Sequence, residues 1–331
     1  MSCPELRILF AGNPDIAVPA LKALSQNFTV VGVLTNPDKP TGRGRHMEPP
    51  PVKVEAQRLG IPVLQYDRLR ADSRASVSDL GPNLLISFAC GHYFGPKFLA
   101  LFECGAINIH PSLLPKYRGS SPLQFALLHG ERKTGISVQR IVAQIDSGDI
   151  LSSTEIDLDG TETTTTLGEL VAPLAADLIV GTLEKWRDGS LVERQQDERE
   201  ATFSRMLTKA DGEIDWSKSA REIHCMVRAF QPWPRAYTTF GDKTLFITAV
   251  HGSLFDLSNE PIETDVQPGT VLGRIKKKGF AIACGDGMLH VDRLQLAQKK
   301  EMDSAAFSNG NPSIIGAVLG IAQGEVSGNG K

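Results

Sequence analysis

The sequence predicts an α/β fold: a Rossmann-like, mostly parallel sheet with helices on both faces, followed by a smaller C-terminal β-barrel that is OB-like. In the first half of the chain, short continuous apolar runs alternate with helical patterns, as expected for parallel strands buried on both faces. After residue 236, β-rich runs follow one another closely between turn residues, which is typical of a small barrel. A polar, highly charged stretch separates the two patterns.

Six runs in the first half are interpreted as strands of the sheet, the first four of them apolar. They are residues 6–12, 28–36, 83–91, 105–110, 135–141 and 149–158. A helical pattern follows the first run, with Asn13 as the predicted N-cap and Pro14 at the first helical position. Pro19 lies inside this pattern and is a candidate kink.

Two further helices are predicted from capping patterns. Thr166 and Glu169 have the spacing of a capping box, so a long helix is expected to begin at Thr166 and to end near Gly189. In the second half, Ser219 and Glu222 form the same pattern. Apolar residues at helical spacing follow it and predict a core-facing side; they are Ile223, Met226, Val227 and Phe230.

These elements divide the chain into four parts: a first domain, a linker, a barrel domain and a disordered tail. The expected boundaries are 1–189, 190–205, 206–321 and 322–331.

Composition limits the class of protein. The chain has 331 residues and a formal net charge of −3, so a strongly basic nucleic-acid binder is not indicated. No apolar run is judged long enough to span a bilayer, and no basic region precedes the first apolar run, which predicts a cytoplasmic protein without membrane contact. The five cysteines are scattered, odd in number and without a CxxC pair. Reduced thiols are therefore expected, not a disulfide framework or zinc ribbon.

The stretch INIHPSLLP, residues 107–115, carries the strongest chemical signal. Asn108 and His110 are two residues apart, so in a strand they share one face. Ligands bind at the carboxyl ends of strands in open parallel sheets, and this strand ends at His110. An amide can stabilise charge growing on a carbonyl oxygen, and an imidazole can share that charge or carry a proton. Asp146, in a glycine-flanked turn, could orient the ring or accept a proton.

This set suits direct acyl transfer to an amine better than covalent catalysis, because no activated Ser or Cys nucleophile accompanies it. The alternative is structural: Asn108 caps a turn, His110 is a hydrogen-bonded strand-end histidine and Asp146 is a turn residue. A metal is disfavoured because no HxH or HxxxH spacing is present. NAD is disfavoured because AGNPD, not GxGxxG, follows the first strand.

The segments NIHPSLLPKYRGSSP and TGISVQRIVAQIDSGDIL resemble the signature of the 10-formyltetrahydrofolate-dependent formyltransferases. The resemblance implies that 10-formyltetrahydrofolate is the co-substrate and that Asn108, His110 and Asp146 are catalytic, acting through a tetrahedral intermediate. It also implies two sets of folate contacts. They are Ser112, Leu113, Leu114 and Pro115, and Phe88, Ala89, Cys90 and Gly91.

Within that family, the chain is most similar to the branch that formylates the free α-amino group of initiator methionyl-tRNA. The loop NPDKPTGRGR and the segment IDWSKSAREIHCMVRAFQPWPRAYTTF carry this resemblance. It implies that residues 1–189 are catalytic and that 206–321 bind tRNA. The enzyme is expected to be a monomer. The expected tRNA contacts are basic residues: Arg43, Arg45, Lys209, Lys276, Lys277 and Lys278. For the three consecutive lysines, a solvated hairpin tip is the alternative.

Two other functions stay open at this stage. One is formyl transfer to a small acceptor, glycinamide ribonucleotide or an amino sugar. The second domain is the feature that distinguishes the tRNA-formylating branch from the enzymes that use these acceptors. The other is a non-catalytic RNA-binding module with the same fold. The intact set of Asn108, His110 and Asp146 argues against that module.

Overall fold

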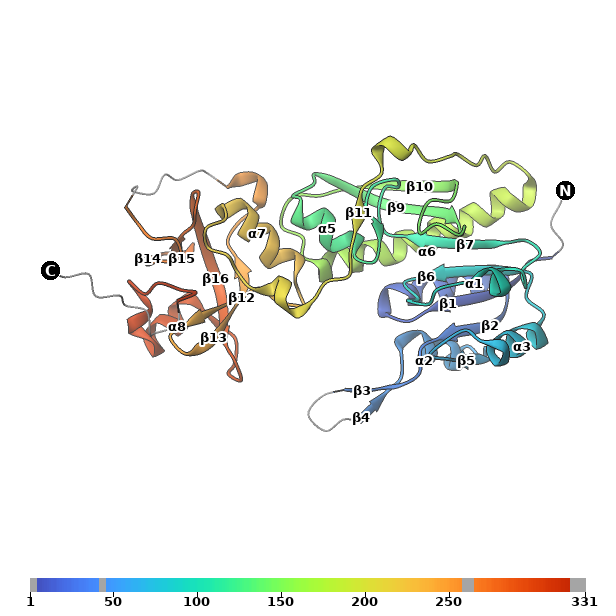
Figure 1. The fold of residues 1–331 in the computed structure, drawn as a ribbon, viewed down its shortest axis with the longest axis horizontal. Coiled ribbons are helices and arrows are strands. Elements are labelled where there is room, and N and C mark those ends of the chain that lie inside the picture. The colour runs from blue at the N-terminus through green and yellow to red at the C-terminus, as the bar shows by residue number, and fades with distance from the viewer. Residues whose placement is uncertain (1–4, 42–45, 258–264, 322–331) are drawn as a thin grey trace. The chain divides into compact units, whose positions relative to one another are not determined.

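The computed structural model describes residues 5–41, 46–257 and 265–321. The chain forms two compact units (Figure 1). Unit 1 consists of Met1–Pro122, Thr134–Ile156 and Gly168–Ser204. Unit 2 consists of Leu123–Lys133, Asp157–Leu167 and Arg205–Lys331.

The centre of unit 1 is a seven-stranded sheet of order β10-β9-β7-β6-β1-β2-β5 (Figure 1). The strands are β1 Arg7–Gly12, β2 Thr29–Thr35, β5 Val63–Gln65, β6 Leu84–Phe88, β7 Ala106–His110, β9 Lys133–Arg140 and β10 Ile150–Asp157. Neighbours from β5 to β7 pair in parallel, whereas β7 and β9 pair antiparallel. All six predicted strands are present, and the mostly parallel sheet is confirmed; β5 was not predicted.

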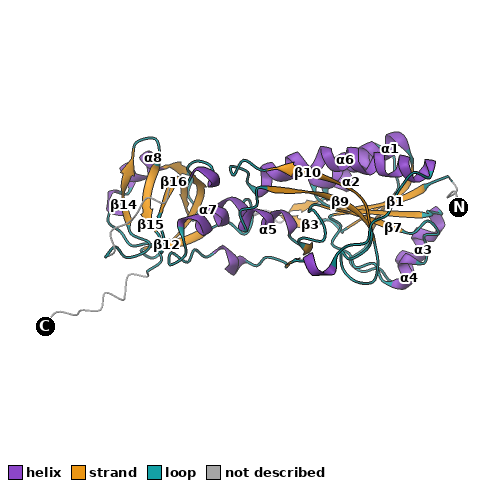
Figure 2. Ribbon diagram, turned by 90° about the horizontal axis from the view of Figure 1, so that it is seen from above, coloured by secondary structure: helices purple, strands orange, loops and turns teal. Residues whose placement is uncertain are grey.

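Helices cover both faces of this sheet (Figure 2). Their bounds are α1 Val18–Asn27, α2 Pro51–Arg58, α3 Ala71–Leu80, α4 Pro96–Leu99 and α6 Thr164–Asp188. Helix α5, Pro122–Leu128, lies almost wholly in unit 2. Helices α1 and α6 lie on one face, and α3 and α4 lie on the other. Shorter strands are β3 Lys39–Thr41, β4 His46–Glu48, β8 Arg118–Gly119 and β11 Phe203–Ser204.

The predicted start of the first helix is wrong. Asn13 does not cap it, because the Asn13 side chain accepts from Thr35 Oγ1 and from the Asn36 N–H, both at 2.7 Å, and donates to the Cys90 carbonyl. Asn13 thus joins the ends of neighbouring strands. The regular helix α1 begins only at Val18, so Pro19 lies in its first turn, where proline is tolerated, and no kink is needed.

Helix α6 begins two residues earlier than predicted. Thr163 and Thr166 cap it reciprocally: each side-chain oxygen accepts from the other's backbone N–H, at 3.0 and 3.2 Å. The expected pair of Thr166 and Glu169 is therefore not the capping pair. The end near Gly189 is confirmed, since Gly189 has φ +77° directly after the helix.

By length and composition, α6 could also cross a membrane, contrary to the expectation that no segment was suitable. The expectation failed because it sought an uninterrupted apolar run, whereas the apolar residues of α6 alternate with a few polar ones. Val171, Ala175, Ile179 and Leu183 recur every four residues and are fully buried. A helix that packs one face against a core passes the same test, so the finding is weak support for a membrane span.

Unit 2 contains an antiparallel sheet of order β12-β13-β16-β15-β14, with β17 also paired to β16. The strands are β12 Tyr237–Phe240, β13 Lys243–Val250, β14 Val271–Ile275, β15 Gly279–Ala283, β16 Met288–Leu296 and β17 Met302–Asp303. Its helices are α7 Ala220–Ala229 and α8 Ser304–Gly310. Leu319 N–H donates to the Gly269 carbonyl beside β14, and Gly320 N–H donates to Thr239 in β12. One segment therefore bridges the two edge strands, as in a barrel.

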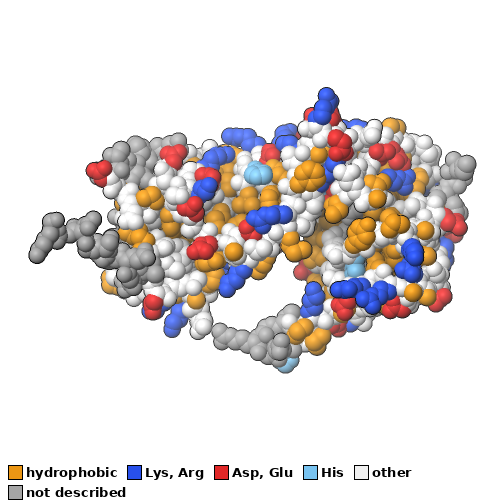
Figure 3. Space-filling view, viewed as in Figure 1, with side chains coloured by type: hydrophobic (Ala, Val, Ile, Leu, Met, Phe, Trp, Pro, Cys, Tyr) orange, Lys and Arg blue, Asp and Glu red, His pale blue; other side chains and the backbone are white. Residues whose placement is uncertain are grey.

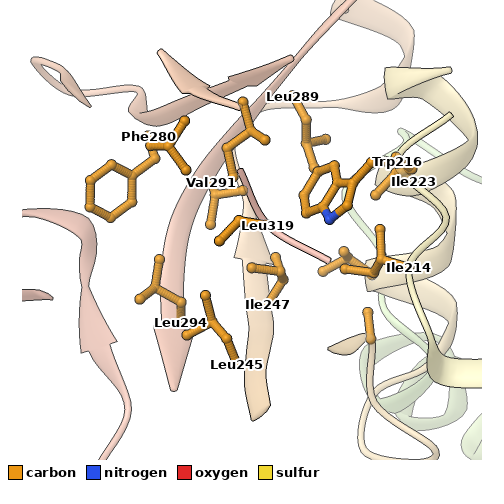
Figure 4. Packing of buried hydrophobic residues seen from close by; sticks show 14 of the residues in the cluster. Ile214, Trp216, Ile223, Leu245, Ile247, Phe280, Leu289, Val291, Leu294 and Leu319 are labelled. Atoms are coloured by element: carbon orange, nitrogen blue, oxygen red, sulfur yellow. The ribbon is translucent and has the colours of Figure 1, made fainter. Parts of the chain in front are cut away.

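Helix α7 closes one side of the unit 2 core (Figure 4). The predicted capping box is confirmed: Ser219 accepts from the Glu222 N–H, and the Glu222 side chain accepts from the Ser219 N–H. Ile223 and Val227 are each 1% exposed and belong to the core, as their spacing predicted.

The cysteines differ from expectation at one position. Cys104 is disulfide-bonded, whereas Cys90, Cys225 and Cys284 are free and buried. The number and scatter of cysteines in a sequence do not tell which thiols approach one another in space, so the expectation of reduced thiols throughout was wrong.

A buried histidine in α7 makes the stability of unit 2 depend on pH. His224 is fully buried, and its Nδ1 accepts from Arg228 Nε at 3.2 Å. Burial, reinforced by the Arg228 charge, lowers the pKa of His224 to about 4 from 6.5. The unfolded chain therefore takes up this proton first. The stabilisation is complete above pH 6.5 and is lost as the pH falls towards 4.

Replacing His224 with glutamine should remove this dependence, because an amide can still accept from Arg228 and does not titrate. Between pH 7.5 and 4.5 the unchanged protein should lose about 2–3 kcal/mol more unfolding free energy than the variant. Urea unfolding at the two pH values measures the difference. Equal losses in both proteins would contradict the assignment.

Candidate active site

Strand β7 places two polar side chains at the carboxyl edge of the sheet. Asn108 is half-buried and His110 is 4% exposed, and they share one face as the strand alternation predicted. The antiparallel partner β9 sets Gln139 opposite Asn108 and Ser137 opposite His110. Four polar residues therefore meet where apolar strands end.

Asp146 comes from the loop between β9 and β10 and meets both side chains. Its Oδ1 lies 3.3 Å from Asn108 Nδ2, and its Oδ2 lies 3.6 Å from His110 Nδ1. The backbone of Asp146 is left-handed, with φ +50°, a conformation that Asp and Asn adopt more readily than most residues. The structure therefore brings together the three residues that the sequence singled out.

The ring of His110 is oriented by a backbone carbonyl. His110 Nε2 lies 2.8 Å from the Tyr117 oxygen, and a carbonyl only accepts, so Nε2 carries the proton of this hydrogen bond. Nδ1, which faces Asp146, is consequently the nitrogen that can gain or release a proton within the site.

The Asp146 carboxylate is held from two other directions. Gly119 N–H donates to Oδ2 at 2.9 Å, and Gln139 Nε2 donates to Oδ1 at 2.7 Å. Gly119 has φ +111°, and a Cβ added there would lie 2.1 Å from the Ser204 carbonyl oxygen. Only glycine lets β8 approach β11 this closely, so the sequence YRG fixes one donor to Asp146.

The predicted folate residues after β6 differ in exposure. Ala89 and Gly91 are exposed and both have positive φ. Phe88 and Cys90 are buried, so contacts to a ligand would come from their backbones. Burial raises the pKa of the Cys90 thiol to about 12, which keeps it protonated at neutral pH and unsuited as a nucleophile.

The second predicted folate segment is the loop after β7. Ser112 is fully buried, and its hydroxyl donates to the Lys116 carbonyl at 2.6 Å, so it shapes the loop itself. Leu114 is also buried. Leu113 and Pro115 are half-buried and are the better exposed members of this set.

The predicted tRNA contacts are only partly within the described residues. Arg43 and Arg45 lie outside them. Lys209 is exposed, and the lysine run, residues 276–278, forms the turn between β14 and β15. The three lysines therefore lie at a hairpin tip, as the alternative predicted. Their contact with tRNA stays a prediction. On the face drawn in Figure 3, basic and acidic side chains are interspersed.

Sequence reasoning missed several residues that position His110 or Asp146. Tyr117 and Gly119 stand inside the quoted motif, but no role was assigned to them. Gln139 is buried in β9, a strand that also contains the buried polar residues Thr134 and Ser137, and no role was assigned to it. Gln196 and Arg118 also contact this network, and Gln196 lies in the stretch that looked like a linker.

Comparisons with known proteins identify relatives along almost the whole chain. Residues 6–183 match the formyl transferase family, and residues 206–312 match the C-terminal domain of formyl transferases. A methionyl-tRNA formyltransferase from Treponema denticola is 38% identical over 318 residues, covering 94% of this chain and 98% of the relative. One from Clostridium novyi is 37% identical over 316 residues, covering 95% and 100%.

The chain belongs to the methionyl-tRNA formyltransferase family. It is therefore a formyl-transferring enzyme. Among solved structures, WlaRD, a sugar 3N-formyltransferase crystallised in the presence of dTDP and 5-N-formyl-THF, matches with a TM-score of 0.64. The match covers 90% of this chain and 100% of WlaRD at 19% identity, which supports the fold alone.

Proposed function

We propose that this enzyme transfers the formyl group of 10-formyltetrahydrofolate to the free α-amino group of initiator methionyl-tRNA. The observation that carries the proposal is the convergence of Asn108, His110 and Asp146 at the carboxyl edge of the sheet, in a chain of this family. The amine nitrogen forms a bond to the formyl carbon, and the bond from that carbon to N10 of the folate breaks. One proton leaves the amine, and one is delivered to N10.

Asn108 suits the stabilisation of the developing oxyanion. An amide carries two N–H groups, and Asp146 accepts from one of them. The second can donate to the formyl oxygen, where negative charge grows during attack. Gln139 accompanies Asn108 and donates to the same carboxylate oxygen, which leaves Asp146 less dependent on the Asn108 amide.

His110 and Asp146 suit the movement of protons. His110 Nδ1 faces the carboxylate, while Nε2 is occupied by Tyr117. Asp146 can accept the amine proton directly or through water, and His110 can support the oxyanion or protonate N10. The positions of His110 and Asp146 are compatible with either role of His110.

The folate is expected beside the two loops that flank β7 and β6, with Leu113, Pro115, Ala89 and Gly91 as the accessible members. The presence of 5-N-formyl-THF in WlaRD crystals supports a folate site on this fold. The tRNA is expected to contact the six basic residues named from the sequence and the domain 206–321. We further propose that the enzyme acts as a cytoplasmic monomer without membrane contact.

A panel of acceptors tests the proposal. Purified enzyme with 10-formyltetrahydrofolate should formylate methionyl-tRNA, with uncharged tRNA, glycinamide ribonucleotide and an amino sugar giving rates lower by about three orders of magnitude or more. Product is measured by release of tetrahydrofolate and by formyl-methionine after tRNA hydrolysis. Faster formylation of either small acceptor would overturn the acceptor assignment. No formylation of any acceptor would favour a binding module.

A further inference from the structure

A buried glutamine links the Asp146 loop to a distant part of unit 1. Gln196 is 6% exposed, and its Nε2 lies 2.9 Å from the Asp146 carbonyl and 2.7 Å from the Gly148 carbonyl. The same nitrogen lies 3.3 Å from Gln139 Oε1. Its Oε1 accepts from two nitrogens of Arg118, at 2.9 and 3.0 Å. Every polar atom of the Gln196 amide therefore has a protein partner.

Arg118 determines which way this amide points. Its side chain is fully buried and donates in addition to Glu198, at 2.8 and 2.9 Å. A guanidinium only donates, so the amide oxygen of Gln196 must face Arg118 and the amide nitrogen must face Asp146. A buried charge is costly unless it is fully hydrogen-bonded. The arrangement therefore disfavours a flipped amide strongly.

Gln139 connects the Gln196 amide to the Asp146 carboxylate. Gln196 Nε2 carries two hydrogens and has three acceptors, so its 3.3 Å contact with Gln139 Oε1 is the longest of the three. The Gln139 nitrogen faces Asp146 Oδ1, to which it donates at 2.7 Å. Donors thus run in one direction from Arg118 through Gln196 and Gln139 to Asp146. The two carbonyls held by Gln196 also flank the left-handed turn. A Cβ added at Gly148 would lie 1.9 Å from the Arg140 oxygen, so this turn is tightly packed.

We propose that Gln196, oriented by Arg118, is a positioning residue for formyl transfer. Its hydrogen bonds hold the Asp146 backbone and, through Gln139, the Asp146 carboxylate in the geometry that faces Asn108 and His110. The inference rests on the proposed function. A small displacement of a catalytic group lowers turnover much more than binding, so the effect should fall on kcat.

Gln196→Met tests the role, because methionine has nearly the same length and volume but donates no hydrogen bond. We expect kcat to fall about 10- to 100-fold, while KM for the folate and for methionyl-tRNA changes less than about threefold. Gln196→Glu keeps an oxygen for Arg118 but turns a second oxygen towards the Asp146 carbonyl. It should therefore not rescue kcat.

Thr182→Val is the matched control. Thr182 is 1% exposed in the same unit. Its hydroxyl donates to the Leu178 carbonyl at 2.6 Å and contacts the Ser152 hydroxyl on β10, so both of its partners lie outside the hydrogen-bond network of Asp146. This variant, like Gln196→Met, should lose thermal stability because a buried hydrogen bond is removed, yet it should keep kcat within about twofold. A kcat for Gln196→Met within about threefold of the unchanged protein, or an equal kcat loss in Thr182→Val, would overturn the inference.

If Gln196→Met does not fold, Gln139→Met interrupts the same chain of donors one step closer to Asp146 and should show the same fall in kcat without a change in KM. The activity of the unchanged protein tests the proposed function, whereas the ratio of the kcat of the variant to the kcat of the unchanged protein tests the positioning role of Gln196. Should the acceptor panel identify another amine, the ratios are measured with that amine.

Discussion

Replacing Asp146 with asparagine should lower kcat by about two to four orders of magnitude, the range expected when a general acid–base group is removed. Asparagine tolerates the left-handed backbone at this position, so the turn should be kept. The charge that faces His110 Nδ1 is lost, and one oxygen that accepts from Gly119 or Gln139 becomes a donor. Single-turnover rates with methionyl-tRNA measure the effect on the chemical step.

Asp177→Asn is a suitable control, because Asp177 is exposed on α6 and the same change of charge should leave kcat within about twofold. Folate affinity, measured by fluorescence titration, should change less than about threefold in Asp146→Asn, because the carboxylate is assigned to proton movement and not to binding. A kcat for Asp146→Asn within about fivefold of that of the unchanged protein would show that Asp146 takes no part in the chemical step.

Replacing Trp216 with alanine should destabilise unit 2 by about 3–5 kcal/mol. Trp216 is 5% exposed and lies in the core shown in Figure 4. Its Nε1 donates to Thr238 Oγ1 at 3.0 Å, and a Cβ added at Gly269 or Gly320 would lie 3.3 Å from its ring, so both backbones pack closely against it. The variant would leave a large cavity and an unpaired hydroxyl. Denaturant unfolding followed by circular dichroism measures the loss.

Trp233→Ala provides the comparison, because Trp233 is in the same unit but 52% exposed. Its removal should cost less than about 1 kcal/mol. Similar losses in the two variants would show that burial of Trp216 does not dominate the stability of this core.

Six of the seven strands of the main sheet were predictable because each is a run rich in apolar or β-branched residues, whereas β5 has only three residues and was not predicted. The Ser219 capping box was predictable because its contacts are local. Asn13 was not, because its partners Thr35 and Cys90 come from strands that only the folded sheet brings near. Local patterns compete with tertiary contacts, and here the tertiary contacts determine the side-chain position.

The same distinction holds at the site. Asn108 and His110 follow from strand alternation, a local rule, and their meeting with Asp146 follows from the resemblance. Gln196 could not be found this way, because it lies 50 residues from Asp146 in a polar stretch without a periodic pattern. Its role depends on a buried guanidinium, and burial of a charged residue cannot be read from neighbouring letters.

The pairing of β11 with β8 has a practical consequence for anyone shortening this protein. A fragment that ends with α6 would retain Asn108, His110 and Asp146, the residues with a proposed role in the reaction. It would lack strand β11 and the Gln196 amide, which donates to the Gly148 carbonyl in the turn before β10. The residues proposed to act in the reaction all precede residue 150, but the contacts that hold Asp146 in place are complete only in a fragment that extends to Ser204.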